Sequence, residues 1–154
     1  MFNLSACRYT LRDRSFDIYV SGCNGKNGVH CNGCHNPQLW DETFGRPWET
    51  YCESITDSIA KAGSLVQSIR IYGGEPLEKT ETDLKAFLAF ILGFKLPIWL
   101  FTRFEFNEVP TWILDCVEYI KCGEYDETKR GVVEFYGVQL QTTNQKIYKK
   151  GVDY

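Results

Sequence analysis

The clearest pattern in the chain is a run of apolar residues with helical spacing. The positions i, i+3, i+4, i+7 and i+8 of this run are Leu84, Phe87, Leu88, Ile91 and Leu92. Such a run places its apolar side chains on one face of an α-helix. Thr80 precedes the run and Asp83 follows three residues later, which resembles an N-terminal capping box. The segment is therefore predicted to be an amphipathic helix.

Shorter apolar runs, rich in β-branched and aromatic residues, alternate with the helical segments. They predict strands at residues 16–21, 66–72, 97–102 and 116–122, and a late strand at 132–140. Further helices are predicted at residues 47–62 and around 108–115. No linker rich in Gly, Ser or Pro and no internal repeat interrupts the pattern. We therefore expect residues 1–154 to form a single domain.

The alternation of strands and helices predicts an α/β fold with a parallel sheet, because helical connections between strands make right-handed crossovers. Ligands of such folds bind beyond the carboxyl ends of the strands. Four unusual segments lie there: a cysteine-rich loop, a Gly-Gly-Glu-Pro turn, Thr102-Arg103 and Gly123. A chain of 154 residues is too short for a complete TIM barrel of about 250. We expect an incomplete TIM-like βα barrel with one site at this edge.

Charge and composition narrow the class of protein. The chain has 17 basic and 20 acidic residues, a net charge of −3, and no stripe of Lys and Arg. This balance gives no electrostatic support for binding nucleic acid. The N-terminal stretch carries charges throughout and has no long apolar run, so we expect neither a signal peptide nor a membrane span. We therefore expect a cytoplasmic protein.

The cysteines suggest a metal centre. There are seven, an odd number that argues against a complete disulfide framework. Cys23, Cys31 and Cys34 lie close together in the loop after the first strand. Thiolates favour zinc, copper(I) or iron–sulfur centres. The four scattered cysteines are expected to be small buried apolar residues, dispensable for a metal centre: Cys7, Cys52, Cys116 and Cys122.

The number of local thiols separates the possible metal centres. A structural zinc site needs four ligands, and His30 or His35 could complete one, although zinc knuckles usually bring their ligands as two separated pairs. An electron-transfer cluster normally takes four cysteines. Three cysteines in one loop would leave one iron of a cluster without a protein ligand. An open coordination position is where a metal site performs chemistry. We therefore expect an iron–sulfur cluster with one open iron, and assign neither histidine as a ligand.

The turn at Gly73-Gly74-Glu75-Pro76 is the second candidate binding element. Two glycines allow the backbone to approach a ligand closely and to adopt positive φ. Main-chain groups there can hold the ammonium and carboxylate of an amino acid, and Glu75 adds an acceptor for a cation. Alone, the motif could be an ordinary turn. Together with the cysteine loop one βα unit upstream, it indicates a site, to which we also assign Asn36 and Thr102.

These motifs resemble the radical S-adenosylmethionine (SAM) superfamily. The cysteine triad followed by Gly-Gly-Glu-Pro carries the resemblance, and CHNPQLWDETFG resembles the stretch after the last cluster cysteine in glycyl-radical activating enzymes. The segments IWLFT, YIKCGEYDE and TTNQKIYKKG resemble the branch that activates anaerobic ribonucleoside-triphosphate reductase. The resemblance extends from Phe16 to Gly151. One departure is the seven-residue gap before Cys31, where that superfamily usually has three; doubling a flexible loop costs only about 0.6 kcal/mol.

The resemblance implies a fold, cofactors and a partner. It implies a partial βα barrel of the radical SAM type, with a [4Fe–4S] cluster on Cys23, Cys31 and Cys34. The open iron would take the amino and carboxylate groups of SAM, and the Gly-Gly-Glu-Pro turn would help hold its methionine end. An electron donor such as flavodoxin or ferredoxin would allow SAM to be cleaved. The resulting radical would abstract hydrogen from a glycine of a large partner enzyme.

The partner is also expected for a physical reason. An incomplete barrel has an open side, and a radical exposed to water would be quenched, so a large protein would serve as substrate and lid. Four aromatic residues near the site are candidates for the docking surface, although at least two are expected to be ordinary core: Trp40, Phe44, Trp48 and Phe104. The alternatives are a radical enzyme acting on a small molecule, for which the short chain leaves few enclosing elements, and a non-enzymatic metal-binding module.

Overall fold

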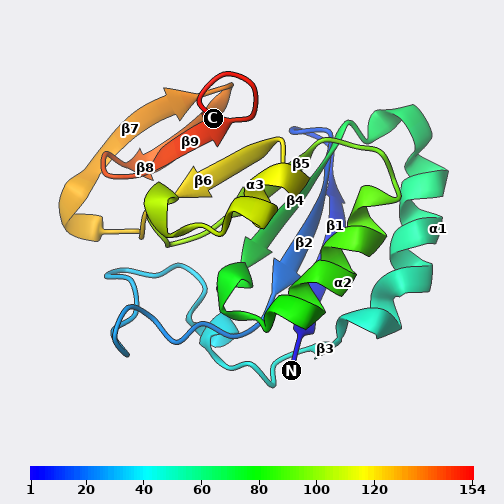
Figure 1. Ribbon diagram of the computed structural model, residues 1–154, viewed down its shortest axis with the longest axis horizontal. Helices are drawn as coiled ribbons and strands as arrows, with labels where there is room; N and C mark the ends of the chain where they lie inside the picture. The colour runs from blue at the N-terminus through cyan, green and yellow to red at the C-terminus, as the bar shows by residue number, and fades with distance from the viewer.

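A mixed seven-stranded sheet forms the centre of the molecule (Figure 1). The computed structural model describes all residues from Met1 to Tyr154. The sheet order is β3-β1-β2-β4-β5-β6-β9. Its four central strands pair in parallel: β2 (Ser15–Val20), β4 (Ser68–Gly73), β5 (Ile98–Phe101) and β6 (Tyr119–Cys122). The sequence pattern predicts all four, although β6 begins later than expected because a helix occupies the residues before it.

The outer strands are antiparallel, so the sheet is mixed and not wholly parallel as predicted. On one side β1 (Asn3–Thr10) pairs with β2, and the short β3 (Arg46–Pro47) pairs with β1. On the other side β9 (Lys146–Lys149) pairs with β6. Strand β1 was not predicted, because only one of its faces is covered: Cys7 and Tyr9 pack on the core while Arg8 is exposed. The sheet stays open, with β3 and β9 at its two edges.

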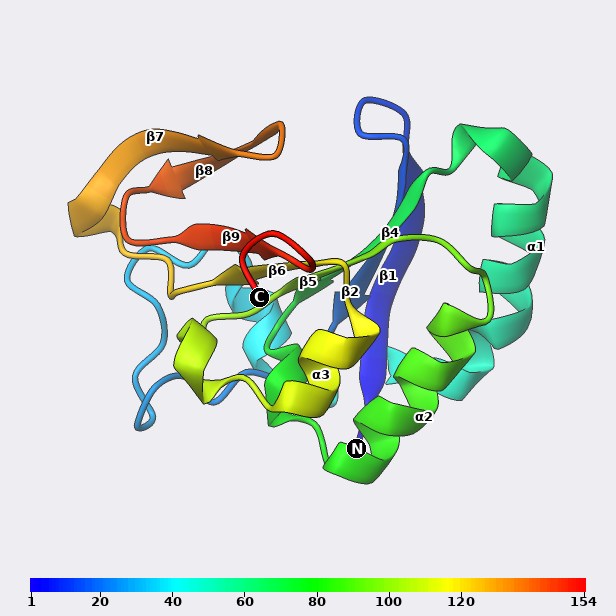
Figure 2. The ribbon, with the colours of Figure 1, turned by 45° about the horizontal axis from the view of Figure 1, so that its top comes forward.

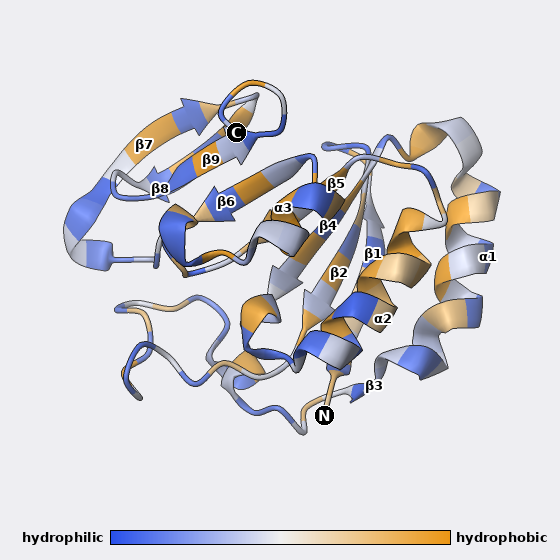
Figure 3. Cartoon of the chain, viewed as in Figure 1, coloured by the Kyte–Doolittle hydropathy of each residue, from blue (hydrophilic) through white to orange (hydrophobic).

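Three helices cover one face of the sheet (Figures 1 and 2). They are α1 (Cys52–Ala62), α2 (Glu81–Leu92) and α3 (Thr111–Cys116). The predicted apolar face of α2 packs against the sheet, and its cap is formed by the Thr80 hydroxyl, which accepts from the Asp83 N–H at 3.2 Å. In Figure 3 apolar residues recur along these helices and along the central strands, and many of them form the main core. Its largest fully buried side chains include Phe87, Ile18, Ile71 and Leu100.

Short 3₁₀ turns supplement these helices. They are η1 (Pro37–Trp40), η2 (Trp48–Tyr51), η3 (Gly63–Leu65), η4 (Pro76–Glu78), η5 (Phe106–Glu108) and η6 (Glu127–Lys129). The helix predicted at 47–62 therefore begins as η2 and continues as α1. Trp48 of η2 is buried against Phe87 and Phe90. It belongs to the core, as expected for at least two of the four aromatic candidates.

A separate hairpin covers part of the opposite face (Figure 2). Its strands β7 (Arg130–Phe135) and β8 (Val138–Thr142) replace the single late strand predicted at 132–140. Tyr136 and Gly137 both have positive φ, 52° and 77°, which is the backbone of a tight primed hairpin turn. Leu140 of the hairpin packs on Trp99 and Ile147 in a second, smaller core. None of the helices has the length and apolar character needed to cross a membrane.

The four scattered cysteines lie where the sequence places them. Cys122 is buried in the helix-facing core. The other three cysteines are partly buried and pack against this core: Cys7, Cys52 and Cys116. None of the four lines the cavity described below. No cysteine is in a disulfide.

Candidate functional site

One cavity of about 320 Å³ lies at the carboxyl ends of the four parallel strands. The cysteine loop, the Gly-Gly-Glu-Pro turn and the residues after β5 all contribute to its wall, as the strand topology predicts. The predicted site residues that line it are Cys23, Cys31, Cys34, Asn36, Gly73, Gly74, Glu75 and Thr102. Pro76 is buried at the start of η4 and does not line the cavity. Gly123, which follows β6, is not part of the wall either.

A row of side chains across the sheet forms one wall of the cavity. Tyr19, Tyr72, Phe101 and Lys121 are neighbours across β2, β4, β5 and β6 on the face opposite the helices. Tyr72 lies 5.4 Å from Tyr19 and 4.3 Å from Phe101, measured between ring centroids. Sequence reasoning missed these four residues. Their signal is the period-2 alternation within each strand, since their chain neighbours Ile18, Ile71, Leu100 and Ile120 point into the core.

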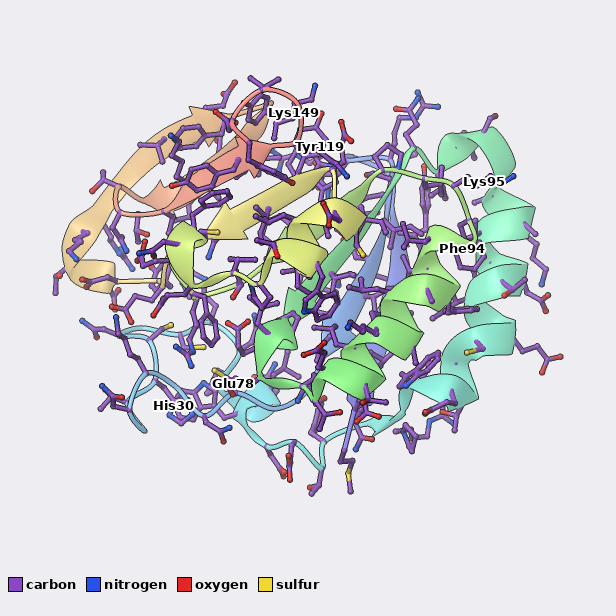
Figure 4. The ribbon with its side chains drawn as sticks, in the orientation of Figure 1. His30, Glu78, Phe94, Lys95, Tyr119 and Lys149 are labelled. Atoms are coloured by element: carbon purple, nitrogen blue, oxygen red, sulfur yellow. The ribbon has the colours of Figure 1, made fainter.

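The loop that carries Cys23 is tied to the body of the protein by backbone hydrogen bonds. The N–H of Gly22 donates to the Leu39 carbonyl at 2.8 Å, and the N–H of Cys23 donates to the Trp40 carbonyl at 3.1 Å. The N–H of Asn24 donates to Glu78 Oε2 at 2.7 Å. These contacts fix the first cysteine relative to the turn after β4. His30 and Glu78 are labelled in Figure 4 at this edge, opposite the edge with Tyr119 and Lys149.

The seven-residue gap between the first two cysteines folds into a turn. Lys26 and Val29 form an isolated antiparallel bridge, so the chain reverses between them. His30 then stacks on Trp40 with ring centroids 3.8 Å apart, and its Nε2 lies 2.8 Å from the Cys23 carbonyl oxygen. The loop therefore returns Cys31 to the cavity that Cys23 lines. His30 holds the loop through its ring, while His35 packs on Tyr125 at the cavity wall.

The three cysteines are arranged around one shared cavity. No three His, Cys, Asp or Glu side chains are grouped closely enough to ligate one ion. A four-iron cluster is bound through separate iron atoms, so its thiolates stand further apart around a larger space. The three thiols share one cavity of that kind. Burial raises the pKa of the Cys23 and Cys31 thiols, so binding iron would have to displace their protons.

The two glycines of the turn are required by the backbone around them. A Cβ on Gly73 would lie 2.3 Å from the Val20 carbonyl oxygen, and Gly73 has φ +118°. A Cβ on Gly74 would lie 2.3 Å from the Gly22 carbonyl oxygen. The N–H of Gly74 donates to the Val20 carbonyl at 2.6 Å. The turn therefore packs directly on the start of the cysteine loop, and close approach of a ligand to these glycines stays a prediction.

Glu75 links the ends of two strands. Its side chain is 1% exposed. Oε1 accepts from Thr102 Oγ1 at 2.6 Å and from the Leu77 N–H at 3.0 Å, and Oε2 accepts from the Arg103 N–H at 2.8 Å. Burial raises the pKa of this carboxyl group, and the three donors oppose that effect. Both carboxylate oxygens are thus used within the chain, so Glu75 orders the cavity wall.

Two basic residues line the cavity, and only one is paired. The guanidinium of Arg103 forms a salt bridge with Glu78. Lys121 Nζ donates to the carbonyl oxygens of Gly123 at 2.7 Å and Thr102 at 3.2 Å, and forms no ion pair. Because the surrounding protein removes the ammonium group from water, its pKa is lowered to about 8.

Together these features define an α/β protein with a cavity lined by three cysteines at the carboxyl edge of a sheet. The chain matches the model of the 4Fe-4S single cluster domain family over residues 13–145. It therefore belongs to that family and is an iron–sulfur protein. The matched range includes the cysteine loop, the Gly-Gly-Glu-Pro turn and the β7–β8 hairpin. Among curated proteins, none matches the chain closely enough to add to this assignment.

Proposed function

We propose that the protein is a radical SAM activating enzyme that generates a glycyl radical on a large partner, most simply an anaerobic ribonucleoside-triphosphate reductase. One observation carries the proposal. The cavity is lined by three thiols, which would leave one iron of a cluster without a protein ligand, and also by the Gly-Gly-Glu turn and Thr102. A closed electron-transfer site would need a fourth thiolate. Cys122, at the end of β6, points into the core instead.

The residues of the chain divide the proposed work between them. Cys23, Cys31 and Cys34 would hold the [4Fe–4S] cluster, which when bound would supply one electron to the sulfonium of SAM. Gly73 and Gly74 would present main-chain groups to the methionine end. Glu75 and Thr102, hydrogen-bonded to each other at 2.6 Å, would keep the wall beside it rigid. The rest of the cavity, with Asn36 and the aromatic row, would enclose the adenosine.

The open sheet supports the same class. We propose that its four parallel strands and three covering helices correspond to a partial βα barrel of the radical SAM type. In a barrel-like sheet the helices lie outside and the site lies on the inner face, near the carboxyl ends of the strands. The wall residues here, Tyr19, Tyr72, Phe101 and Lys121, lie on that inner face.

A large partner suits the openness of the site. Tyr72 and Phe101 also line a second cavity of about 450 Å³ between the β1–β2 turn and the β7–β8 hairpin. Together the two cavities open a longer stretch of the inner face than a small molecule would occupy. Trp40 and Phe44 are 37% and 45% exposed after the cysteine loop, and Phe104 is partly buried against Arg103. A one-electron donor, flavodoxin or ferredoxin, would have to reach the same edge.

The proposal is tested by anaerobic reconstitution with iron and sulfide. The loaded, reduced protein is incubated with SAM, and 5′-deoxyadenosine and methionine are measured. We expect both products, and a glycyl-radical doublet in the electron paramagnetic resonance spectrum of an added candidate reductase. One bound zinc ion in place of iron and sulfide would identify a metal-binding module. Turnover of a small molecule, with no radical on any candidate reductase, would favour a radical enzyme of another substrate class.

A further inference from the structure

Lys121 occupies an unusual position for a lysine. It is the third residue of β6, and its chain neighbours Ile120 and Cys122 both point into the helix-facing core. By the alternation of a strand, Lys121 points to the opposite face, where it lines the cavity together with the three cluster cysteines. Charged ammonium groups are normally kept in water or paired with an anion. Lys121 is only partly exposed, and it forms no ion pair within the chain.

The groups that contact Lys121 carry no full negative charge. Its Nζ donates to two main-chain carbonyl oxygens, those of Thr102 and Gly123, and it has no carboxylate partner. Glu75 is the buried carboxylate of the same wall, but its oxygens already accept from Leu77, Thr102 and Arg103. The other cation of the wall, Arg103, is neutralised by Glu78. Lys121 therefore brings to the cavity a positive charge that no carboxylate contacts, although the charge of Glu75 acts on it from the same wall.

The cluster of the family would add negative charge to this cavity. Lys121 and the three cysteines line the same cavity, so a cluster held there would lie within electrostatic reach of the ammonium group. A [4Fe–4S] cluster with three thiolates carries net negative charge, and reduction by one electron increases it. A fixed cation stabilises the reduced form more than the oxidised form, and this preference is strong where water is scarce.

We propose that Lys121 is the counter-charge of the cluster and raises its reduction potential, which brings the cluster within reach of a biological one-electron donor. Lys121 acts on the cluster through the electric field and does not ligate iron. The inference requires the iron–sulfur cluster of the family and does not depend on SAM cleavage or on a partner. It therefore stands or falls separately from the proposed activating function.

The test is a redox titration of reconstituted protein, without SAM, followed by electron paramagnetic resonance. Lys121→Met keeps the length of the side chain and removes the charge, while Lys121→Arg keeps the charge. Lys61→Met, at an exposed position of α1, is the matched control. We expect a more negative midpoint potential for Lys121→Met and potentials near that of the wild-type protein for Lys121→Arg and Lys61→Met.

Two outcomes would overturn the proposal. One is an unchanged midpoint potential in Lys121→Met at full iron content. The other is a difference that appears only after SAM is added, because Lys121 would then serve the carboxylate of that ligand and not the cluster. If Lys121→Met does not retain iron, Lys121→Gln provides the neutral variant for the same titration, and circular dichroism of the apoproteins shows that each variant is folded.

Discussion

At the scale of single residues, the buried Glu75 and the partly exposed Lys121 bring charges of opposite sign to one cavity wall. Glu75 receives three hydrogen bonds from the chain, so its cost of burial is offset within the protein. Lys121 donates to only two carbonyl oxygens, and its pKa is lowered to about 8. An anionic group beside Cys31 would therefore stabilise the charge of Lys121. Around Thr102 the apoprotein already satisfies the charge of Glu75 with its own hydrogen bonds.

The lysine gives a prediction about stability and pH. Lys121→Met should stabilise the apoprotein at pH 7 by about 2 kcal/mol, less than the full pKa shift implies because water in the cavity screens part of the charge. The unfolded lysine binds a proton up to about pH 10.4, whereas the folded one loses it near 8, so the wild-type penalty disappears between these values. Urea unfolding of both apoproteins from pH 7 to 10.5 should show the difference shrinking; a constant difference would contradict this account.

The cysteines give a second prediction. Replacing Cys23, Cys31 or Cys34 by Ala should remove most of the reconstituted iron and the visible absorbance of the cluster, because each thiol lines the cavity. Cys122→Ser and Cys116→Ser serve as controls, since these residues belong to or pack on the helix-facing core. Iron and sulfide analysis measures the effect. Full loading in all three alanine variants would refute the ligand assignment, and iron loss in Cys122→Ser would point to a fourth ligand.

At the scale of elements, the turn after β4 and the loop after β2 form one unit. The N–H groups of Gly74 and Glu75 donate to the carbonyls of Val20 and Gly22. Glu78 of η4 accepts from the Asn24 N–H and pairs with Arg103 after β5. Three strand ends are thereby fixed to one another around the first cysteine. The position of Cys23 thus depends on the Gly-Gly-Glu-Pro turn even before any ligand binds to it.

This dependence gives a third prediction. Gly74→Ala should destabilise the apoprotein by about 1–3 kcal/mol, since the new Cβ would lie 2.3 Å from the Gly22 carbonyl oxygen and force the two segments apart. It should also lower iron retention during incubation with a chelator. Gly93→Ala is the control, because its nearest contact is 3.1 Å and its φ of −58° suits alanine. Normal stability and iron retention in Gly74→Ala would show that the two segments are not coupled.

At the scale of the whole molecule, the two faces of the sheet have different tasks. The helix-covered face contains the main core. The other face is covered only partly, by the β7–β8 hairpin, and leaves two adjoining cavities that share Tyr72 and Phe101. The proposed large partner would cover this open region and exclude water during hydrogen abstraction.

The partner gives a fourth prediction. Phe44→Asp should reduce the yield of glycyl radical on the reductase several-fold while leaving 5′-deoxyadenosine formation without partner unchanged, because Phe44 is exposed and does not line the cavity. Val152→Asp changes an exposed apolar residue near the C-terminus and is the control. Radical yield is quantified by spin counting. An equal loss in both variants, or a loss of SAM cleavage in Phe44→Asp, would remove Phe44 from the docking surface.

The sequence by itself determined the features that depend on local order and spacing. The period of α2, the four parallel strands and the position of the unusual segments after them all follow from the apolar pattern. Parallel strands present their carboxyl ends at one edge, so the convergence of the cysteine loop, the glycine turn and Thr102 on one cavity was predictable. An iron–sulfur centre was predicted from the number and softness of the local thiols and its [4Fe–4S] type from the family resemblance, and the family match supports a 4Fe–4S cluster.

Only the tertiary structure decided which faces are covered, because burial depends on contacts between residues distant in sequence. Strand β1 has one exposed face and so lacks a continuous apolar signal, and the β7–β8 hairpin depends on positive φ at Tyr136 and Gly137. Trp48 is similar in sequence context to the exposed Trp40, yet it packs beneath α2. Lys121 reads as an ordinary polar residue of a strand. It lies without an ion pair in the cavity of Cys23, Cys31 and Cys34 only because β5 and β9 flank its strand and the cysteine loop returns to the same edge.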